Sequence, residues 1–154
     1  MTRIDTAPTR EEDIPALLAV LDQTGLFPGD MLADMISPAL SGEAPDIWLS
    51  GRIDGEVVGF AYTAPEAFAE NVWNMFALAV RPDHQGGGLG AALVAATEER
   101  LRRAGQRLLL VETSGADAFE RTRSFYARIG FAQEARIRDY WSEGEDKVIF
   151  RKAL

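Results

Sequence analysis

The chain has 154 residues, 47% of them hydrophobic, and a formal net charge of −8. This length and apolar content predict one globular domain, residues 1–154, with a full hydrophobic core. The chain contains no cysteine and one histidine, which excludes disulfides and multi-residue Cys or His metal sites, so we expect no metal. The acidic balance argues against a nucleic-acid partner. No apolar run approaches the roughly 20 residues of a membrane span and no signal peptide is evident, so we expect a cytoplasmic protein without a membrane partner.

The first predicted elements are a strand and two helices. Arg3–Ala7 is expected to form a short strand, and Thr9 with Glu12 has the form of a capping box that opens a helix. The apolar face of that helix consists of Ile14, Leu17, Leu18 and Leu21. A second, short helix is expected over Met31–Ile36, stopped by Pro38 because proline lacks the N–H that a helix interior needs.

Three β-rich runs follow. Ile47–Ile53 and Glu56–Tyr62 flank the pair Asp54-Gly55, which is a strong hairpin signal because a tight turn needs positive φ. Asn71–Val80 is a third run, rich in aromatic and branched residues. Short connections between the three runs predict an antiparallel meander.

Helices and strands then alternate to the end of the chain. A helix is expected over Gly88–Ala104, with Glu98 among its solvated residues, followed by a buried strand over Arg107–Thr113. A last helix is expected over Asp117–Ile129. The closing hairpin is expected to pair 131–141 with 147–152. This order predicts an α/β (α+β) fold with a mixed, mostly antiparallel twisted sheet of about seven strands and helices on both faces.

The segment Phe76–Ala92 (FALAVRPDHQGGGLGAA) combines a strand end, a polar loop, consecutive glycines and the first turn of a helix. Glycines remove every Cβ from a patch of backbone, so main-chain N–H groups can approach a bulky ligand. The positive end of the helix dipole points into the same patch. An anion such as a pyrophosphate suits this site, although a glycine run is also found in plain flexible turns.

One reading of the glycines is a dinucleotide site. Gly86, Gly88 and Ala91 match G-x-G-x-x-A, and Glu112 ends the next strand where a ribose-binding acid is expected. The context argues against it, because five residues separate Val80 from Gly86 and the motif follows a meander instead of opening a βαβ series. A nucleotide-dependent oxidoreductase is therefore a distant alternative.

A second reading fits both the motif and its surroundings. Gln85–Gly90 (QGGGLG) matches the motif (Gln or Arg)-x-x-Gly-x-(Gly or Ala), and Ser124–Phe131 (SFYARIGF) looks like the segment FY-x-x-x-GF. Both segments recur in the GNAT superfamily of acyl-CoA-dependent N-acetyltransferases, which the chain resembles from end to end. The resemblance implies a single acyl-CoA N-acyltransferase domain whose sheet is splayed between strands 4 and 5.

The same resemblance assigns roles to residues. Main-chain groups of Leu78, Ala79 and Val80 would pair with the pantetheine arm of acetyl-CoA like an added strand. The pyrophosphate would be wrapped by Gln85, Gly86, Gly87, Gly88, Leu89 and Gly90. Many members carry an Asn near the start of the last helix that contacts the cofactor. Phe119 stands there in this chain, so we expect Ser114, Thr122 or Arg123 to take over that contact.

Two residues are candidates for the chemistry of acetyl transfer. The resemblance implies that Tyr126 donates a hydrogen bond to the departing thiolate, although a core aromatic would show the same spacing. Glu112 is a candidate general base because it ends a buried strand, and an ion pair is an equally good explanation. Glu70 and Asp139 are weaker candidates. The lone His84 is more simply a loop residue.

Two functions follow from these expectations. The first is an acetyl-CoA-dependent N-acetyltransferase acting on a small-molecule amine or a protein amino group. The second is a catalytically silent acyl-CoA-binding module that senses the cofactor or regulates a partner. The acceptor pocket is expected to use aromatic residues, namely Phe27, Tyr62, Trp73, Tyr140 and Trp141. Neither the acceptor nor the oligomeric state follows from the sequence, and a homodimer stays open.

Overall fold

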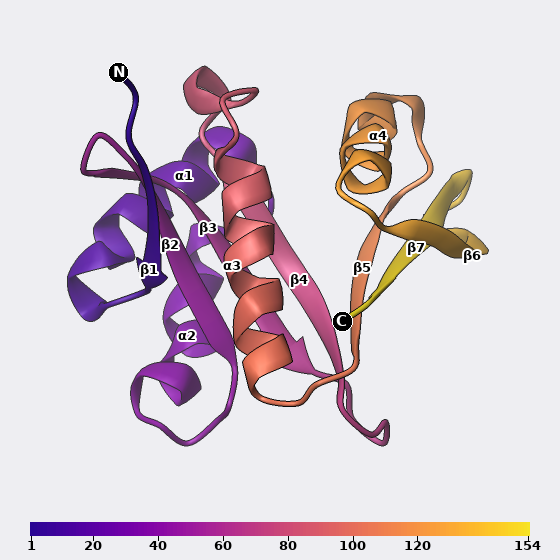
Figure 1. Ribbon diagram of the computed structural model, residues 1–154. Helices are drawn as coiled ribbons and strands as arrows, with labels where there is room; N and C mark the ends of the chain where they lie inside the picture. The colour runs from indigo at the N-terminus through magenta and orange to yellow at the C-terminus, as the bar shows by residue number, and fades with distance from the viewer.

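The computed structural model describes residues 1–154 as one twisted sheet with helices on both faces (Figure 1). The strands are β1 (Ile4–Pro8), β2 (Ile47–Ile53), β3 (Glu56–Pro65), β4 (Val72–Val80), β5 (Leu108–Ser114), β6 (Ala132–Ser142) and β7 (Glu145–Ala153). The helices are α1 (Ile14–Thr24), α2 (Leu32–Leu40), α3 (Leu89–Arg103) and α4 (Glu120–Arg128). The strand order is β1-β2-β3-β4-β5-β7-β6, and β4 with β5 is the parallel pair among antiparallel ones. The predicted fold class is confirmed.

Two hydrophobic clusters lie on opposite faces of this sheet. Helices α1 and α2 bury Leu17, Leu21, Leu32 and Ile36 against Phe60 and its neighbours. On the other face, α3 and α4 bury their apolar side chains against strands on both sides of the sheet centre. That cluster includes Leu89, Leu93, Val94, Leu101, Tyr126, Met75, Val111 and Phe150. At about 25 cal/mol per Å² of apolar area, these two clusters supply most of the stabilising free energy of the fold.

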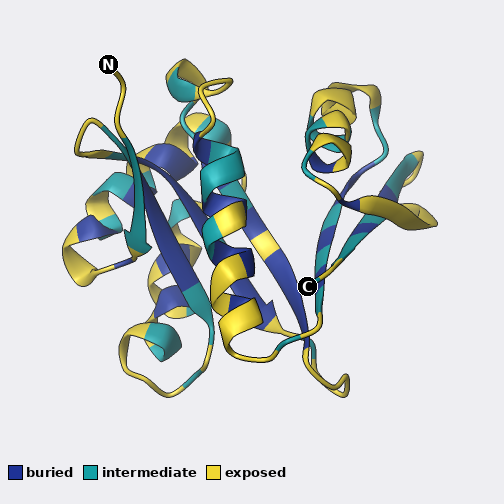
Figure 2. Ribbon diagram, in the orientation of Figure 1, coloured by how far each residue is buried: buried dark blue, intermediate teal, exposed yellow.

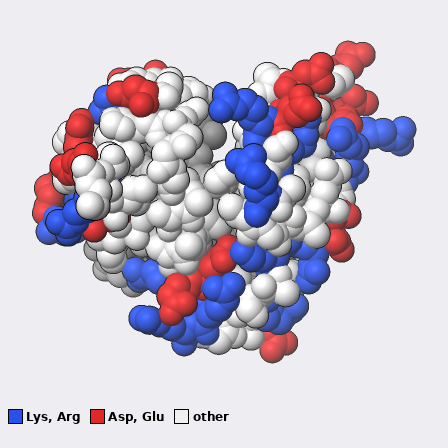
Figure 3. Space-filling view, turned by 45° about the horizontal axis from the view of Figure 1, so that its top comes forward, with Lys and Arg blue, Asp and Glu red and all other residues white.

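Strands β4 and β5 pair over a short stretch and then part. Their register runs from Val72 opposite Leu108 to Met75 opposite Val111. Beyond that point β4 continues to Val80 and β5 to Ser114 without pairing to each other, and the two ribbons diverge in Figure 1. We call the space between residues 76–80 of β4 and residues 112–114 of β5 the opening. Seen from that end, the surface is hollowed between the two halves of the molecule, and basic side chains gather along one wall (Figure 3).

The sequence misplaced two helix boundaries. Thr9 does not cap α1, because its hydroxyl hydrogen-bonds Ser50 Oγ at 2.9 Å. Ahead of the helix, the main-chain N–H of Arg10 donates a hydrogen bond to Asp13 Oδ2 at 3.0 Å. Pro38 lies inside α2, and the helix continues to Leu40. The proline removes one main-chain N–H, which costs little so near the end of the helix.

Glu98 was expected to be solvated and is instead 5% exposed on the inner side of α3. Both of its oxygens lie 3.1 Å from Lys152 Nζ of β7. The same ammonium donates to the carbonyl of Ile129, 2.7 Å away, just after α4. A buried carboxylate needs such a partner, and here the partner joins α3, α4 and β7.

Candidate active site

The inner edge of β4 carries main-chain groups that no strand uses beyond Met75. On its other side β4 pairs with β3, with Leu78 opposite Ala61 and Val80 opposite Gly59. The N–H of Arg81 donates to the carbonyl of Val58 on β3. Because main-chain groups alternate in direction along a strand, the N–H and C=O of Leu78 and Val80 point toward the opening, and those of Ala79 point toward β3. An extended ligand can therefore add to this edge as a further strand.

A β-bulge marks the point where the strands part. Tyr62 lies opposite Ala77 and Thr63 opposite Met75, which leaves Phe76 without a partner on β3. Phe76 is 52% exposed, and it is the one exposed residue of β4, visible as the exposed band in that strand in Figure 2. Its ring lies 5.9 Å from the ring of Tyr62. Phe76 was not among the residues expected at the site, because the bulge that exposes it depends on the pairing of β4 with β3 and leaves no local signal in the sequence.

The glycine loop lies at the far end of β4. A short turn over Pro82–His84 leads to Gln85, whose side-chain amide donates to the carbonyl of Val80 at 3.0 Å. Gly86 and Gly88 have φ of 82° and 96°, values that L side chains rarely adopt. A Cβ on Gly86 would meet nothing within 4 Å, so the space above this backbone is open. Helix α3 begins at Leu89 with its N–H groups directed at the same space, which fits a pyrophosphate.

Leu89 and Gly90 contribute main chain to the loop and packing beneath it. The Leu89 side chain is 1% exposed, and a Cβ on Gly51 or Gly59 would clash with it. A Cβ on Gly90 would lie 3.4 Å from the ring of Phe125 on α4. The ring of Phe125 on α4 therefore packs beside the first turn of α3.

Tyr126 lies on α4 within an aromatic cluster. It is 5% exposed, and its ring centre is 5.2 Å from that of Phe125, 5.6 Å from that of Phe131 and 5.8 Å from that of Phe150. Its hydroxyl has no hydrogen-bond partner within the protein. Burial raises the pKa of Tyr126 well above its ordinary value, so the hydroxyl keeps its proton and can donate a hydrogen bond.

Glu112 stands on β5 directly after Val111, the last residue paired with β4. Its Oε1 lies 2.9 Å from Lys147 Nζ on β7, and its Oε2 accepts a hydrogen bond from Asn74 Nδ2 at 3.0 Å. The same amide donates to Glu66 Oε1 at 2.8 Å. Glu112 thus faces away from α3 and α4, opposite Phe76 across the start of the opening. The ion-pair interpretation of Glu112 is correct, and its position keeps it a candidate proton acceptor.

Two of the three residues expected to replace the missing Asn, Ser114 and Arg123, hold a loop together. Arg123 Nη1 donates to the carbonyls of Ser114 and Ala116, both at 2.8 Å. Ser114 Oγ donates to Glu145 Oε2 at 2.7 Å and accepts the N–H of Ala116 at 3.0 Å. These contacts fix the connection between β5 and α4. Ser114 Oγ and Arg123 Nη1 already have hydrogen-bond partners in the protein. A contact of either residue with the cofactor stays a prediction.

The aromatic residues expected around the acceptor divide between the two faces. Trp73 belongs to the α3 face, where its Nε1 donates to Gln106 Oε1 at 2.8 Å. It therefore lies on the opposite face of the sheet from Tyr62. Tyr62 lies on the α1 face and donates to Asp46 Oδ2 at 3.0 Å. Burial, together with that hydrogen bond, raises the pKa of Tyr62 to about 12. Tyr140 and Trp141 lie beside Lys147, near Glu112.

The weaker base candidates have structural surroundings. Glu70 lies in the exposed turn before β4, at the end of the strand away from the glycine loop. Asp139 Oδ1 accepts the N–H of Gly144 at 2.8 Å within the last hairpin. His84 lies in the short turn before the glycines, 3.7 Å from Asp83, as a loop residue would.

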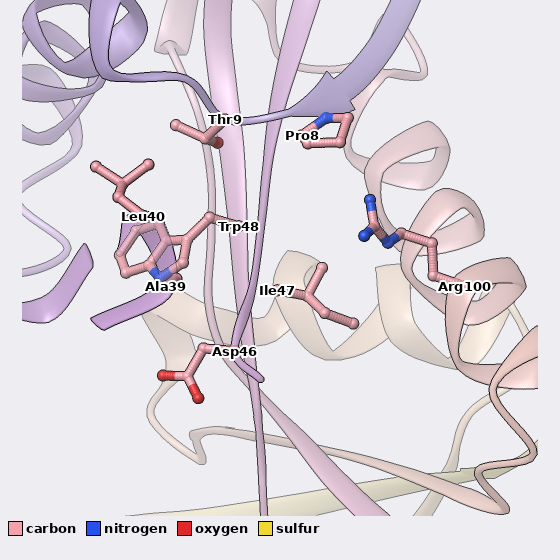
Figure 4. A pocket seen from close by; sticks show the side chains of 8 residues that line it. All are labelled: Pro8, Thr9, Ala39, Leu40, Asp46, Ile47, Trp48 and Arg100. Atoms are coloured by element: carbon pink, nitrogen blue, oxygen red, sulfur yellow. The ribbon is translucent and has the colours of Figure 1, made fainter. Parts of the chain in front are cut away.

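A separate small cavity of about 170 Å³ lies at the outer edge of the sheet, where β1 ends (Figure 4). It is lined by Pro8, Thr9, Ala39, Leu40, Asp46, Ile47, Trp48 and Arg100. Strands β2 and β3 separate this edge from β4, so the cavity is not part of the opening.

Residues 16–131 match the family described as Acetyltransferase (GNAT) family. The chain belongs to the GNAT family of acetyltransferases. The match begins within α1 and ends with the last residue of the FY-x-x-x-GF segment, so it contains the glycine loop, the opening, Glu112 and Tyr126.

Two relatives and two solved structures show what this GNAT chain is similar to. It is 29% identical over 149 residues to the aminoglycoside N(6')-acetyltransferase type 1 of Stenotrophomonas maltophilia, covering 87% of this chain and 92% of that one. It is 36% identical over 97 residues to a mycothiol acetyltransferase of Saccharomonospora viridis, 58% of this chain but 30% of that longer protein. A GNAT-family protein from Desulfovibrio desulfuricans superposes with a TM-score of 0.87 at 29% identity, covering 98% of this chain and 99% of that one. An aminoglycoside 6'-N-acetyltransferase solved with coenzyme A shares the fold, with a TM-score of 0.80 at 16% identity over 97% and 96% of the chains.

No helix of the chain combines the length and apolarity needed to cross a bilayer.

Proposed function

We propose that this protein transfers the acetyl group of acetyl-CoA to a primary amine by direct attack of the amine on the thioester. The observation that carries the proposal is the parting of β4 from β5 with three groups around it. These are the main-chain edge at Leu78 and Val80, which pairs with no strand, the glycine loop at one end, and the unpaired hydroxyl of Tyr126. Each corresponds to one part of an acetyl-CoA molecule.

The residues present fit the co-substrate. Backbone N–H groups from Gln85 to Gly90 and the start of α3 would hold the pyrophosphate, since an anion is stabilised at a helix N-terminus. The edge at Leu78 and Val80 would bond the pantetheine amides as a strand does. When bound there, acetyl-CoA supplies an activated acyl group, and the opening keeps that group between β4 and β5.

The chain then has three tasks in the transfer. Glu112 would take up a proton of the acceptor ammonium, directly or through water, so that a neutral nitrogen attacks the carbonyl carbon. A backbone N–H on the open edge of β4 would stabilise the oxyanion while the new C–N bond forms. As the C–S bond breaks, Tyr126 would give its proton to the departing sulfur. The second proton lost by the nitrogen would return to Tyr126 through water, and Glu112 would pass its proton to solvent, so the products are the N-acetyl amine, CoA and one proton.

A catalytically silent binding module is the weaker function for this chain. A binding site alone requires neither an unpaired, protonated Tyr126 hydroxyl nor a carboxylate at Glu112 facing the opposite side of the opening. Both are present, which supports turnover. The relatives named for aminoglycoside and mycothiol acetylation support small-molecule amines as the first acceptors to try.

Turnover with a panel of amines tests the proposal. The purified chain is incubated with acetyl-CoA and aminoglycosides, amino sugars, polyamines or short peptides with free N-termini. The release of CoA is measured together with the mass of the acetylated amine. We expect at least one acceptor to be acetylated well above the uncatalysed rate. Cofactor binding without transfer to any amine would support the silent module instead.

A further inference from the structure

Lys147 is a buried lysine beside the opening that the mechanism above does not use. It is 8% exposed, and its ammonium lies 2.9 Å from Glu112 Oε1. The same ammonium sits 4.1 Å from the ring centre of Tyr140 and 5.9 Å from that of Trp141. Burial alone would lower the pKa of Lys147, but the hydrogen bond and the charge of Glu112 outweigh it, so the pKa is raised. Lys147 therefore stays a cation despite its burial.

The last hairpin is deformed where it forms this enclosure. Ile137 lies opposite Lys147 and Ser142 opposite Glu145, so residues 138–141 of β6 share one β7 residue, Asp146. Asp139 takes a positive φ of 54° at the bulge, and Asp146 Oδ1 accepts its N–H at 3.0 Å. The bulge brings two aromatic rings back over the sheet, and Trp141 Nε1 reaches the carbonyl of Thr113 on β5 at 3.3 Å. A strained backbone that places two rings over one ammonium indicates a site, not a plain edge strand.

Lys147 and Asn74 hold Glu112 from two sides. One carboxylate oxygen faces the Lys147 ammonium and the other the Asn74 amide, and Asn74 is 0% exposed. We propose that Lys147 is a positioning residue, which fixes the Glu112 carboxylate at the start of the opening and balances its charge so that it can receive the acceptor amine. This inference rests on the proposed function, because it concerns the same reaction.

The charged groups around Glu112 determine what the loss of Lys147 would do. Lys147 is the cation in contact with it, and Glu66 shares the Asn74 amide with it. Glu145 accepts a hydrogen bond from Ser114, two residues beyond Glu112 on β5, and Arg136 is already paired with Asp146 at 2.7 Å. Without Lys147, two carboxylates would meet at one amide with no cation, which favours protonation at higher pH.

The test is the pH profile of kcat/KM in three variants. Lys147→Met should move the acidic limb of the profile to higher pH by about one unit or more, whereas Lys147→Arg should leave the limb close to that of the parent. Lys152→Met is the matched control, since Lys152 lies on the same strand in its own lysine–carboxylate pair with Glu98, away from Glu112. The acidic limb of Lys152→Met should match that of the parent, even if its melting temperature falls as far as that of Lys147→Met.

A second measurement needs no turnover. In Glu112→Gln the charge that raises the pKa of Lys147 is gone and its burial remains, so the pKa of Lys147 measured by NMR should fall. If Lys147→Met does not yield folded protein, Lys147→Gln carries the same pH-profile test.

The outcomes separate this inference from the proposed function. An active parent whose acidic limb is the same in Lys147→Met would overturn the positioning role alone. An equal shift in Lys152→Met would also overturn it, because the effect would then be general. An unchanged Lys147 pKa in Glu112→Gln would remove the contact on which the inference depends. A parent that acetylates no amine, with the NMR result as expected, would count against the proposed function.

Discussion

Tyr126 and Phe76 show how single residues are set apart from their surroundings. Tyr126 is buried among aromatic rings, yet its hydroxyl has no hydrogen-bond partner within the protein and can donate to a ligand. Phe76 is a large apolar side chain exposed in a strand that is otherwise buried or half-buried. The motif around Tyr126 allowed the sequence to predict its role. Phe76 could not be found that way, because a bulge depends on pairing between strands, which one sequence does not display.

Tyr126→Phe should lower kcat by roughly 10- to 1,000-fold with nearly unchanged affinity for CoA, as expected on losing a contact made in the transition state. The ring packing is kept, so the melting temperature should stay close to that of the parent. Steady-state kinetics and calorimetry with CoA measure the two effects. Equal kcat in the two proteins would remove Tyr126 from the mechanism.

Phe76→Ala should raise the KM for the acceptor by about tenfold while the affinity for CoA changes little, because Phe76 points to the face opposite α3 and the glycine loop. Phe68→Ala provides a control, since Phe68 is likewise exposed but lies in the turn between β3 and β4, at the end of β4 away from the glycine loop, so its acceptor KM should stay that of the parent. A larger loss of CoA affinity than of acceptor KM in Phe76→Ala would place Phe76 on the cofactor side.

At the scale of elements, the glycine loop and α3 act together. The sequence predicted the loop, the helix and the strand before it, because glycine runs and helical periodicity are local signals. It did not predict the burial of Glu98 on the same helix, since the partner Lys152 lies 54 residues away. Likewise, the pairing of Glu112 with Lys147 joins β5 to β7, and local patterns carry no information about such contacts.

Gly88→Ala should weaken CoA binding by at least tenfold. The φ of 96° would cost an alanine about 1–2 kcal/mol, and relaxing that strain would turn the backbone N–H groups away from the pyrophosphate. Gly42→Ala is the matched control, because Gly42 has a φ of 79°, has nothing within 4 Å of its Cβ position, and follows α2.

Calorimetry with CoA and thermal melts distinguish the two glycine variants. Both should lose similar stability, and only Gly88→Ala should lose affinity. Normal CoA binding by Gly88→Ala would show that the loop is a turn and not a binding site. NAD should bind neither the variants nor the parent, and NAD binding as strong as that of CoA would restore the dinucleotide interpretation.

At the scale of the whole molecule, the opening separates β1–β4 from β5–β7, and other contacts must hold these two halves of the sheet together. The parallel pairing of β4 and β5 from Val72 to Met75 is short, and α3 and α4 meet where Phe125 rests on Gly90. The pair of Glu98 and Lys152 adds a third connection between the halves. The sequence predicted the order of elements along the chain, and the family resemblance implied a sheet splayed between strands 4 and 5, but neither showed what holds the two halves together.

Lys152→Met should destabilise the protein by about 2–4 kcal/mol, below the largest losses for buried pairs because the Lys152 side chain is 23% exposed. The double variant Glu98→Leu with Lys152→Met should lose less, since no buried carboxylate is then left unpaired. Urea unfolding of both variants provides the comparison. A double variant less stable than Lys152→Met would show that the pair contributes little beyond its packing.

The proposed function depends most on where acetyl-CoA binds, and amide hydrogen exchange at the open edge of β4 measures this directly. The N–H groups of Leu78 and Val80 face the opening, whereas that of Ala79 faces β3, so Ala79 is a control within the same strand. Saturating acetyl-CoA should slow exchange at Leu78 and Val80 by at least about tenfold and leave Ala79 nearly unchanged. Bound acetyl-CoA with no added protection at Leu78 or Val80 would contradict the account.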